Sequence, residues 1–123
     1  MIDHVHAEGA PAAGGPYSHA TVVGGLMFLS GQRPVDPATG AIVDGIQAQT
    51  RQVLENLRAV LAARGRGPGD VARVTVYLDD IADFDAMNVV YREFFTEPYP
   101  ARTTVAATLR GILVEIDAIA EID

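Results

Sequence analysis

The sequence contains neither cysteine nor lysine among its 123 residues. The absence of cysteine excludes disulfide bonds, thiolate nucleophiles and zinc sites with cysteine ligands. All nine basic residues are arginine, so no side-chain amine can hold pyridoxal phosphate or a substrate ketone as a Schiff base. Any chemistry therefore depends on arginine, histidine, hydroxyl or carboxylate groups.

Long apolar runs and clusters of positive charge are also missing. The longest apolar stretch, ATVVGGLMFL, has about half the length that a membrane-spanning helix needs, and the first residues lack the pattern of a signal peptide. We therefore expect a cytoplasmic protein that does not interact with membranes. The net charge of −7 and the scattered arginines predict no nucleic-acid partner, because phosphate backbones would be repelled.

A chain of this length, 49% apolar and without a polar linker, predicts one domain over residues 1–123. Apolar or alternating segments bounded by turn residues predict strands over residues 18–23, 26–31, 41–43, 70–78, 102–109 and 112–121.

Two segments have helical spacing of apolar residues. The first lies within residues 44–65, with Asp44 and Gln47 as an expected capping box and Gly65 as its stop. The second begins at Asp83, the expected N-cap, and ends before Pro98. The order β-β-β-α-β-α-β-β predicts an α+β fold with both helices on one face of a sheet.

The last two strands carry the most unusual charges. Residues 112–120 alternate, so Glu115 points away from the apolar face that should meet the helices. If Arg110 and Gly111 form a two-residue hairpin turn, Arg102 shares the face of Glu115 but lies roughly 13 Å along the strand. Either this register is wrong, or a second chain brings the two groups together on an open sheet face.

Other polar residues have ordinary explanations. Ser18 and His19 are neighbours on an expected strand and face opposite sides, so with Ser30 they resemble a hydrolase triad only in residue type. His4 and His6 lack a third metal ligand, and we predict no metal site. Arg102 is compatible with a surface salt bridge or with a bidentate fork for a substrate carboxylate, and spacing does not decide between them.

Several motifs, in order, resemble those of the RidA/YjgF/UK114 family of enamine and imine deaminases. They cover nearly the whole chain: GPYSHA at 15–20, LSGQRPVDPATG at 29–40, QTRQVLENL at 49–57, NVVYREFF at 88–95, PAR at 100–102 and LVEIDAIA at 113–120. The resemblance implies a chorismate-mutase-like fold with a mixed sheet, assembled as a homotrimer with ligand clefts between subunits.

The resemblance also implies roles for particular residues. Arg102 would grip the substrate carboxylate and Glu115 would position the attacking water, while Tyr17 and Ser30 would complete the catalytic set. The backbone of Gly31 would lie beside the ligand, and Thr104 would contact it where many relatives have cysteine. A turn two residues shorter than the family pattern precedes Ile112.

The implied activity is cofactor-independent hydrolysis of 2-aminoacrylate-type enamines and their imines, 2-iminopropanoate and 2-iminobutanoate, to 2-keto acids and ammonia. One alternative is a non-catalytic, regulatory binder of small carboxylic or keto acids. Another is a deaminase dedicated to a larger aminoacrylate or aminomuconate. A nucleic-acid or chaperone role is the third, and the net charge of −7 argues against RNA binding.

Overall fold

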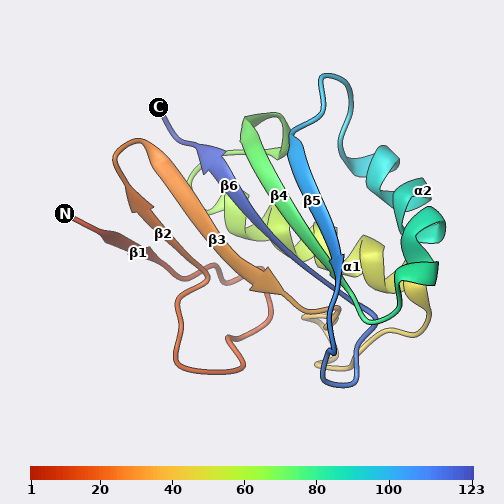
Figure 1. The fold of residues 1–123 in the computed structure, drawn as a ribbon. Helices are drawn as coiled ribbons and strands as arrows, with labels where there is room; N and C mark the ends of the chain where they lie inside the picture. The colour runs from red at the N-terminus through yellow and green to blue at the C-terminus, as the bar shows by residue number, and fades with distance from the viewer.

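A computed structural model describes residues 1–123 as a six-stranded mixed sheet with two α-helices on one of its faces (Figure 1). The α+β fold is therefore confirmed. The strand order is β1-β2-β3-β6-β4-β5, and only β4 and β5 run parallel. The elements are β1 (Asp3–Val5), β2 (Ala20–Val23), β3 (Leu26–Gln32), α1 (Ile46–Ala62), β4 (Val71–Leu78), α2 (Phe84–Phe94), β5 (Ala101–Ala106) and β6 (Val114–Glu121).

The expected hairpin between the last two strands is wrong. Strand β4 lies between β5 and β6, pairing in parallel with β5 and antiparallel with β6. Residues 107–113 therefore form a crossing loop, in which the amide of Leu109 donates to the carboxylate of Asp79 at 2.9 Å and the amide of Asp79 donates to Leu113 O at 3.0 Å. The short connection between β5 and β6 predicted that these two strands pair directly. In the structure β4 lies between them and forms hydrogen bonds with both.

Both helices form where they were expected, and Asp83 is the N-cap of α2 as predicted, although the predicted cap of α1 is wrong. Gly45 is the N-cap of α1, and the expected capping box of Asp44 and Gln47 is absent. Asp83 makes no capping hydrogen bond to α2, whereas Asp80 accepts from the amide of Ala82 one turn earlier. The expected end of the first helix near Gly65 is confirmed, because Gly65 adopts a φ of +68°, a backbone conformation that favours glycine.

The core lies between the sheet and the helices. The predicted inner face of the last strand is confirmed, because five alternating residues are buried: Ile112, Val114, Ile116, Ala118 and Ala120. In β4 the alternation of the sequence would place Ala72 on the inner face with Val74, Val76 and Leu78, and this expectation fails at Ala72. The pairing with β6 shifts register between Val71 and Arg73, so Val71 enters the core and Ala72 is exposed.

The predicted strand at residues 41–43 is reduced to one bridge, between Val35 and Ile42. No helix in the structure is both long enough and apolar enough to cross a membrane. The sheet face opposite the helices is uncovered in Figure 1. This open face carries Phe28, with 39% of its surface exposed, next to Ile119 on the neighbouring strand.

Candidate active site

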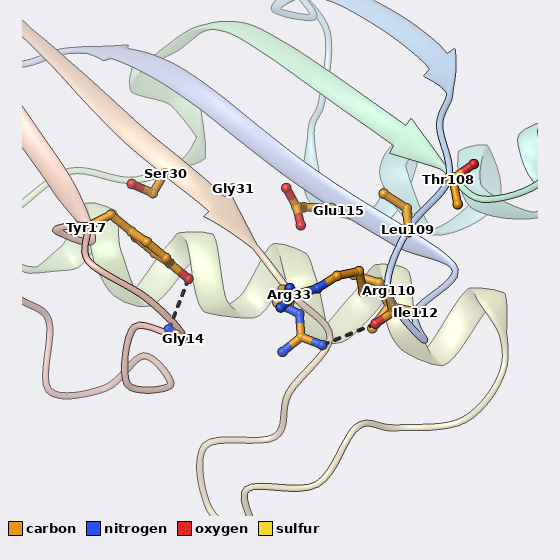
Figure 2. Close-up of a pocket in the computed structure, with 10 residues that line it drawn as sticks. All are labelled: Gly14, Tyr17, Ser30, Gly31, Arg33, Thr108, Leu109, Arg110, Ile112 and Glu115. Atoms are coloured by element: carbon orange, nitrogen blue, oxygen red, sulfur yellow. Dashed lines mark hydrogen bonds between the residues drawn. The ribbon is translucent and has the colours of Figure 1, made fainter.

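A cavity of about 540 Å³ lies where β3 and the 107–113 loop approach the start of β6 (Figure 2). Its lining combines a carboxylate, two guanidinium groups and three hydroxyl groups with small and apolar residues. The lining residues are Gly14, Tyr17, Ser30, Gly31, Arg33, Thr108, Leu109, Arg110, Ile112 and Glu115. The structure thus brings together four of the predicted site residues: Tyr17, Ser30, Gly31 and Glu115.

The contact between Glu115 and Gly31 results from an irregularity in the sheet. Strand β3 pairs regularly with β6 up to Leu29 and resumes at Gln32 with its register shifted. At this irregularity Gly31 lies against Glu115, and a Cβ atom on Gly31 would be 2.6 Å from Oε2 of Glu115. Only a residue without a side chain permits the carboxylate to occupy this position, which explains the glycine.

The environment of Glu115 favours its neutral form. Partial burial is the main cause that raises the pKa of this carboxyl above its ordinary value of 4.5. The positive charge of Arg33 opposes this rise, and the negative charge of Asp117 adds to it. A carboxyl group with a raised pKa can exchange protons with a substrate nearer neutral pH than an ordinary glutamate can.

Two of the three hydroxyl groups of the cavity, those of Tyr17 and Ser30, form hydrogen bonds with the backbone. Tyr17 accepts a hydrogen bond from the amide of Gly14 at 3.0 Å, so its own O–H hydrogen remains available to a ligand. The hydroxyl of Ser30 donates to Ser18 O at 2.7 Å, which leaves its oxygen free to accept.

The possibility of a hydrolase triad finds no support in the geometry. His19 is buried and accepts from the amide of Ala7 at 2.8 Å, while its other ring nitrogen lies 2.8 Å from Pro11 O. Both nitrogens are therefore engaged by the backbone, and His19 fixes the segment that carries Tyr17. His4 contacts Ser18 instead, and no group of three or more potential ligand side chains is arranged to hold a metal ion.

Arg102 does not lie on the same sheet face as Glu115, contrary to the expectation from the hairpin. Arg102 is opposite Val74 of β4, and Glu115 is opposite Tyr77. Three residues along one strand separate these positions by roughly 10 Å and place their side chains on opposite faces. The cavity that contains Glu115 therefore lacks Arg102 of the same chain.

Arg102 instead packs against α2. Its Nη1 donates to Oδ1 of Asn88 at 2.8 Å, and its guanidinium carbon lies 4.5 Å from the centre of the Tyr91 ring. No carboxylate lies within salt-bridge distance. This excludes the surface salt bridge that the sequence left open. The guanidinium of Arg102 is held in one orientation, and no acidic side chain neutralises its charge. Thr104 shares this strand face, and its hydroxyl is buried without a hydrogen-bond partner.

Residues 7–122 match the family model described as Endoribonuclease L-PSP. A RutC family protein of Pyrococcus horikoshii is 50% identical over 123 residues, with 98% of each chain covered. A 2-iminobutanoate/2-iminopropanoate deaminase of Salmonella typhimurium is 43% identical over 125 residues, again with 98% of each chain covered. The chain belongs to the RidA/YjgF family. The resemblance seen in the motifs is thereby confirmed.

A solved structure of the RidA/YjgF family supports the same conclusion for the fold. Escherichia coli TdcF with bound serine matches with a TM-score of 0.91 at 37% identity, and the match covers 98% of this chain and 99% of that chain. The two departures that the motifs led us to expect, Thr104 and a shortened turn before Ile112, fall on β5 and in the 107–113 loop, and that loop lines the cavity.

Two lining residues of this RidA/YjgF protein were missed by sequence reasoning. Arg33 lies two positions after Gly31, whose backbone was expected beside the ligand. This proximity could have indicated that Arg33 also lines the cavity. Arg110 was assigned to a hairpin turn, and nothing in the local sequence predicts that its loop returns to Arg33. Nη2 of Arg33 lies 3.5 Å from the carbonyl oxygen of Arg110.

Proposed function

We propose that this protein is a deaminase that hydrolyses 2-imino acids, formed from 2-aminoacrylate-type enamines, to 2-keto acids and ammonia. The observation that carries the proposal is the half-buried carboxyl of Glu115, with its raised pKa, held against Gly31 in a cavity that also offers the hydroxyl of Tyr17. This arrangement fits a reaction that needs a positioned water and a proton shuttle. It requires no cofactor.

The proposal includes a site built from two chains of a homotrimer. The open sheet face carries the exposed apolar residues Phe28 and Val105, and a small domain gains burial by covering such a face. Because Arg102 and Glu115 of one chain face opposite ways, a cleft between subunits can pair one chain's Glu115 with the partner subunit's Arg102. Arg102 then binds the α-carboxylate of the substrate through its planar fork.

The reaction proceeds in two steps at the imine carbon. Water held by Glu115 attacks the carbon of the protonated imine, the C–O bond forms, and the carboxylate takes a proton from the water. The same proton is then returned to the amine nitrogen of the tetrahedral intermediate, and the C–N bond breaks to release ammonia. As the C=O bond of the keto acid forms, Glu115 takes the remaining hydroxyl proton and passes it to the departing ammonia, which leaves as ammonium. Tyr17 donates to the developing hydroxyl oxygen, and the hydroxyl of Thr104, which has no hydrogen-bond partner within the chain, contacts the carboxylate bound by Arg102.

The relatives support this assignment by analogy. The Salmonella protein named as a 2-iminobutanoate/2-iminopropanoate deaminase shares 43% of its residues with this chain. Serine, bound in the TdcF structure, is a small molecule with an α-carboxylate like the proposed substrates. The word endoribonuclease in the family description suggests a different substrate, but the net charge of −7 disfavours a phosphate backbone.

The test is the rate of keto-acid formation from 2-iminopropanoate, produced in situ from serine by a pyridoxal-dependent dehydratase and followed with semicarbazide as a competing trap. Wild type should accelerate the reaction, while Glu115→Gln and Arg102→Gln should each lose at least about tenfold, the scale of a lost charged hydrogen bond. Glu121→Gln on the same strand and Arg92→Gln on α2 are matched controls, because both residues are exposed and outside the cavity.

The alternatives predict different results. A non-catalytic binder would bind pyruvate in an Arg102-dependent manner without accelerating hydrolysis, and this outcome would overturn the deaminase proposal. RNA cleavage that persists in Glu115→Gln would favour a nuclease instead. Equal activity of wild type and both variants would also contradict the roles given to Glu115 and Arg102.

A further inference from the structure

Two arginines of the cavity, Arg33 and Arg110, form no salt bridge. Arg33 is partly buried and Arg110 is exposed at the rim, and neither guanidinium lies within salt-bridge distance of a carboxylate. Glu115 is the only acidic residue of the lining, and the protein as a whole carries a net charge of −7. Arg33 acts on Glu115 from beyond salt-bridge distance, and one carboxyl group does not balance two guanidinium groups. The excess positive charge in one cavity of an acidic protein therefore calls for a specific explanation.

The backbone that carries Arg33 is held by a buried amide. Nδ2 of Asn56 on α1 donates to the carbonyl oxygens of Arg33 at 3.0 Å and of Val35 at 2.9 Å. Asn56 is only 1% exposed, so both bonds are shielded from water. The position of Arg33 is therefore set by the interior of the protein, unlike that of an arginine on a mobile surface loop.

The loop that carries Arg110 is fixed on both sides. The amide of Leu109 donates to the carboxylate of Asp79 at 2.9 Å, and the amide of Leu113 donates to Oε1 of the buried Gln49 at 2.7 Å. Nη2 of Arg33 reaches the carbonyl oxygen of Arg110 at 3.5 Å and connects the two segments. Figure 2 shows both arginine side chains on one side of the cavity and Tyr17 on the other.

Like charges held in one cavity repel each other, and a bound anion relieves this cost. Guanidinium groups bind carboxylates in a planar, bidentate manner, and Leu109 and Ile112 add apolar surface for methylene groups. A cavity of about 540 Å³ also falls in the range of sites for molecules larger than a three-carbon acid.

We propose that Arg33 and Arg110 form a subsite for a second carboxylate, and that the preferred substrates are dicarboxylic 2-imino acids. The substrate preference rests on the proposed deaminase function, whereas the binding of a second carboxylate by Arg33 and Arg110 does not. The α-carboxylate is bound by the partner subunit's Arg102, and the side-chain carboxylate by Arg33 and Arg110. Water adds across the C=N bond as for the smaller imines, and the products are a dicarboxylic 2-keto acid and ammonia.

The kinetic test compares the imines formed from L-glutamate and L-alanine by amino-acid oxidases in the presence of catalase. Wild type should show kcat/KM at least about tenfold higher for the glutamate imine, and Arg33→Gln and Arg110→Gln should each reduce this ratio by about tenfold. Arg92→Gln removes one exposed positive charge outside the cavity and should keep the wild-type ratio. Equal kcat/KM for the two imines in wild type, or an unchanged ratio in both variants, would overturn the subsite.

A binding test separates this inference from the proposed function. Calorimetry should show that 2-oxoglutarate binds wild type more tightly than 2-oxobutanoate, and that Arg33→Gln abolishes the difference. If neither imine is hydrolysed faster but this binding difference is found, the deaminase proposal fails and the subsite stands. If both imines are accelerated and the two keto acids bind equally, the deaminase stands and the subsite is wrong. Thermal melting of each variant verifies that it is folded.

Discussion

Gly31 and Glu115 are in direct contact across the irregular pairing of β3 and β6, where a Cβ atom on Gly31 would lie 2.6 Å from Oε2 and 3.1 Å from Cδ of Glu115. The absence of a side chain at Gly31 thus determines where the carboxyl group of Glu115, proposed to hold water, can lie. A substitution at Gly31 can therefore displace this carboxyl group while Glu115 itself stays unchanged.

Gly31→Ala should displace the carboxylate of Glu115 and reduce kcat for imine hydrolysis by about 10², because misplacement of a reacting group by about 1 Å has effects of this size. The measurement is the steady-state rate with 2-iminopropanoate, together with the melting temperature. Gly69→Ala is the matched control, since a Cβ there meets nothing within 4 Å. Full activity of Gly31→Ala would show that the position of Glu115 does not matter.

Glu115 should make stability depend on pH in a defined direction. Burial raises the pKa of this carboxyl in the folded state above 4.5, so the folded protein binds its proton more tightly than the unfolded chain does. The contribution of Glu115 to stability is therefore fully present below pH 4.5 and is lost as the pH rises through the raised pKa.

Glu115→Gln removes this titration, so its melting temperature relative to wild type should increase between pH 4 and pH 8. Thermal melts at several pH values test the slope, and Glu121→Gln on the same strand controls for the loss of an exposed carboxylate. A difference between Glu115→Gln and wild type that stays constant with pH would contradict a raised pKa.

Asn56→Ala should lower the free energy of unfolding by roughly 1–3 kcal/mol, because it leaves the carbonyl oxygens of Arg33 and Val35 without their donor. Urea denaturation measures the change. Glu55→Ala, at the neighbouring exposed position on α1, removes only a surface ion pair to Arg58 and should cost at most about 1 kcal/mol. Similar effects of the two substitutions would argue against a structural role for the buried amide.

Phe28→Glu should dissociate the proposed trimer, because it would bury a charge on the open sheet face. Sedimentation equilibrium should find a trimer for wild type and a monomer for the variant. Val89→Glu places the same charge on α2, where Val89 is 48% exposed, and should leave the trimer intact. A wild-type monomer that nevertheless accelerates hydrolysis would contradict a site shared between subunits.

Much of the site could be read from the motifs around individual residues. GPYSHA contains Tyr17, LSGQ contains Ser30 and Gly31, and the alternation of 112–120 shows that Glu115 points away from the core. The structure brings these residues into one cavity, whereas Arg102 and Thr104 lie outside it. Arg33 and Arg110 could not be predicted in the same way, since 76 intervening residues separate two side chains that no shared motif connects.

The sequence by itself determined the helices, most of the strands, their buried faces and the absence of thiol and amine chemistry. These properties depend on residue type and on spacing within a few positions, which the chain carries locally. Only the tertiary structure decided that β4 separates β5 from β6, that Arg102 faces α2, and that two arginines meet beside Glu115. Strand pairing is a long-range choice that depends on how the whole sheet and its helices pack, and a short loop between two strands does not determine it.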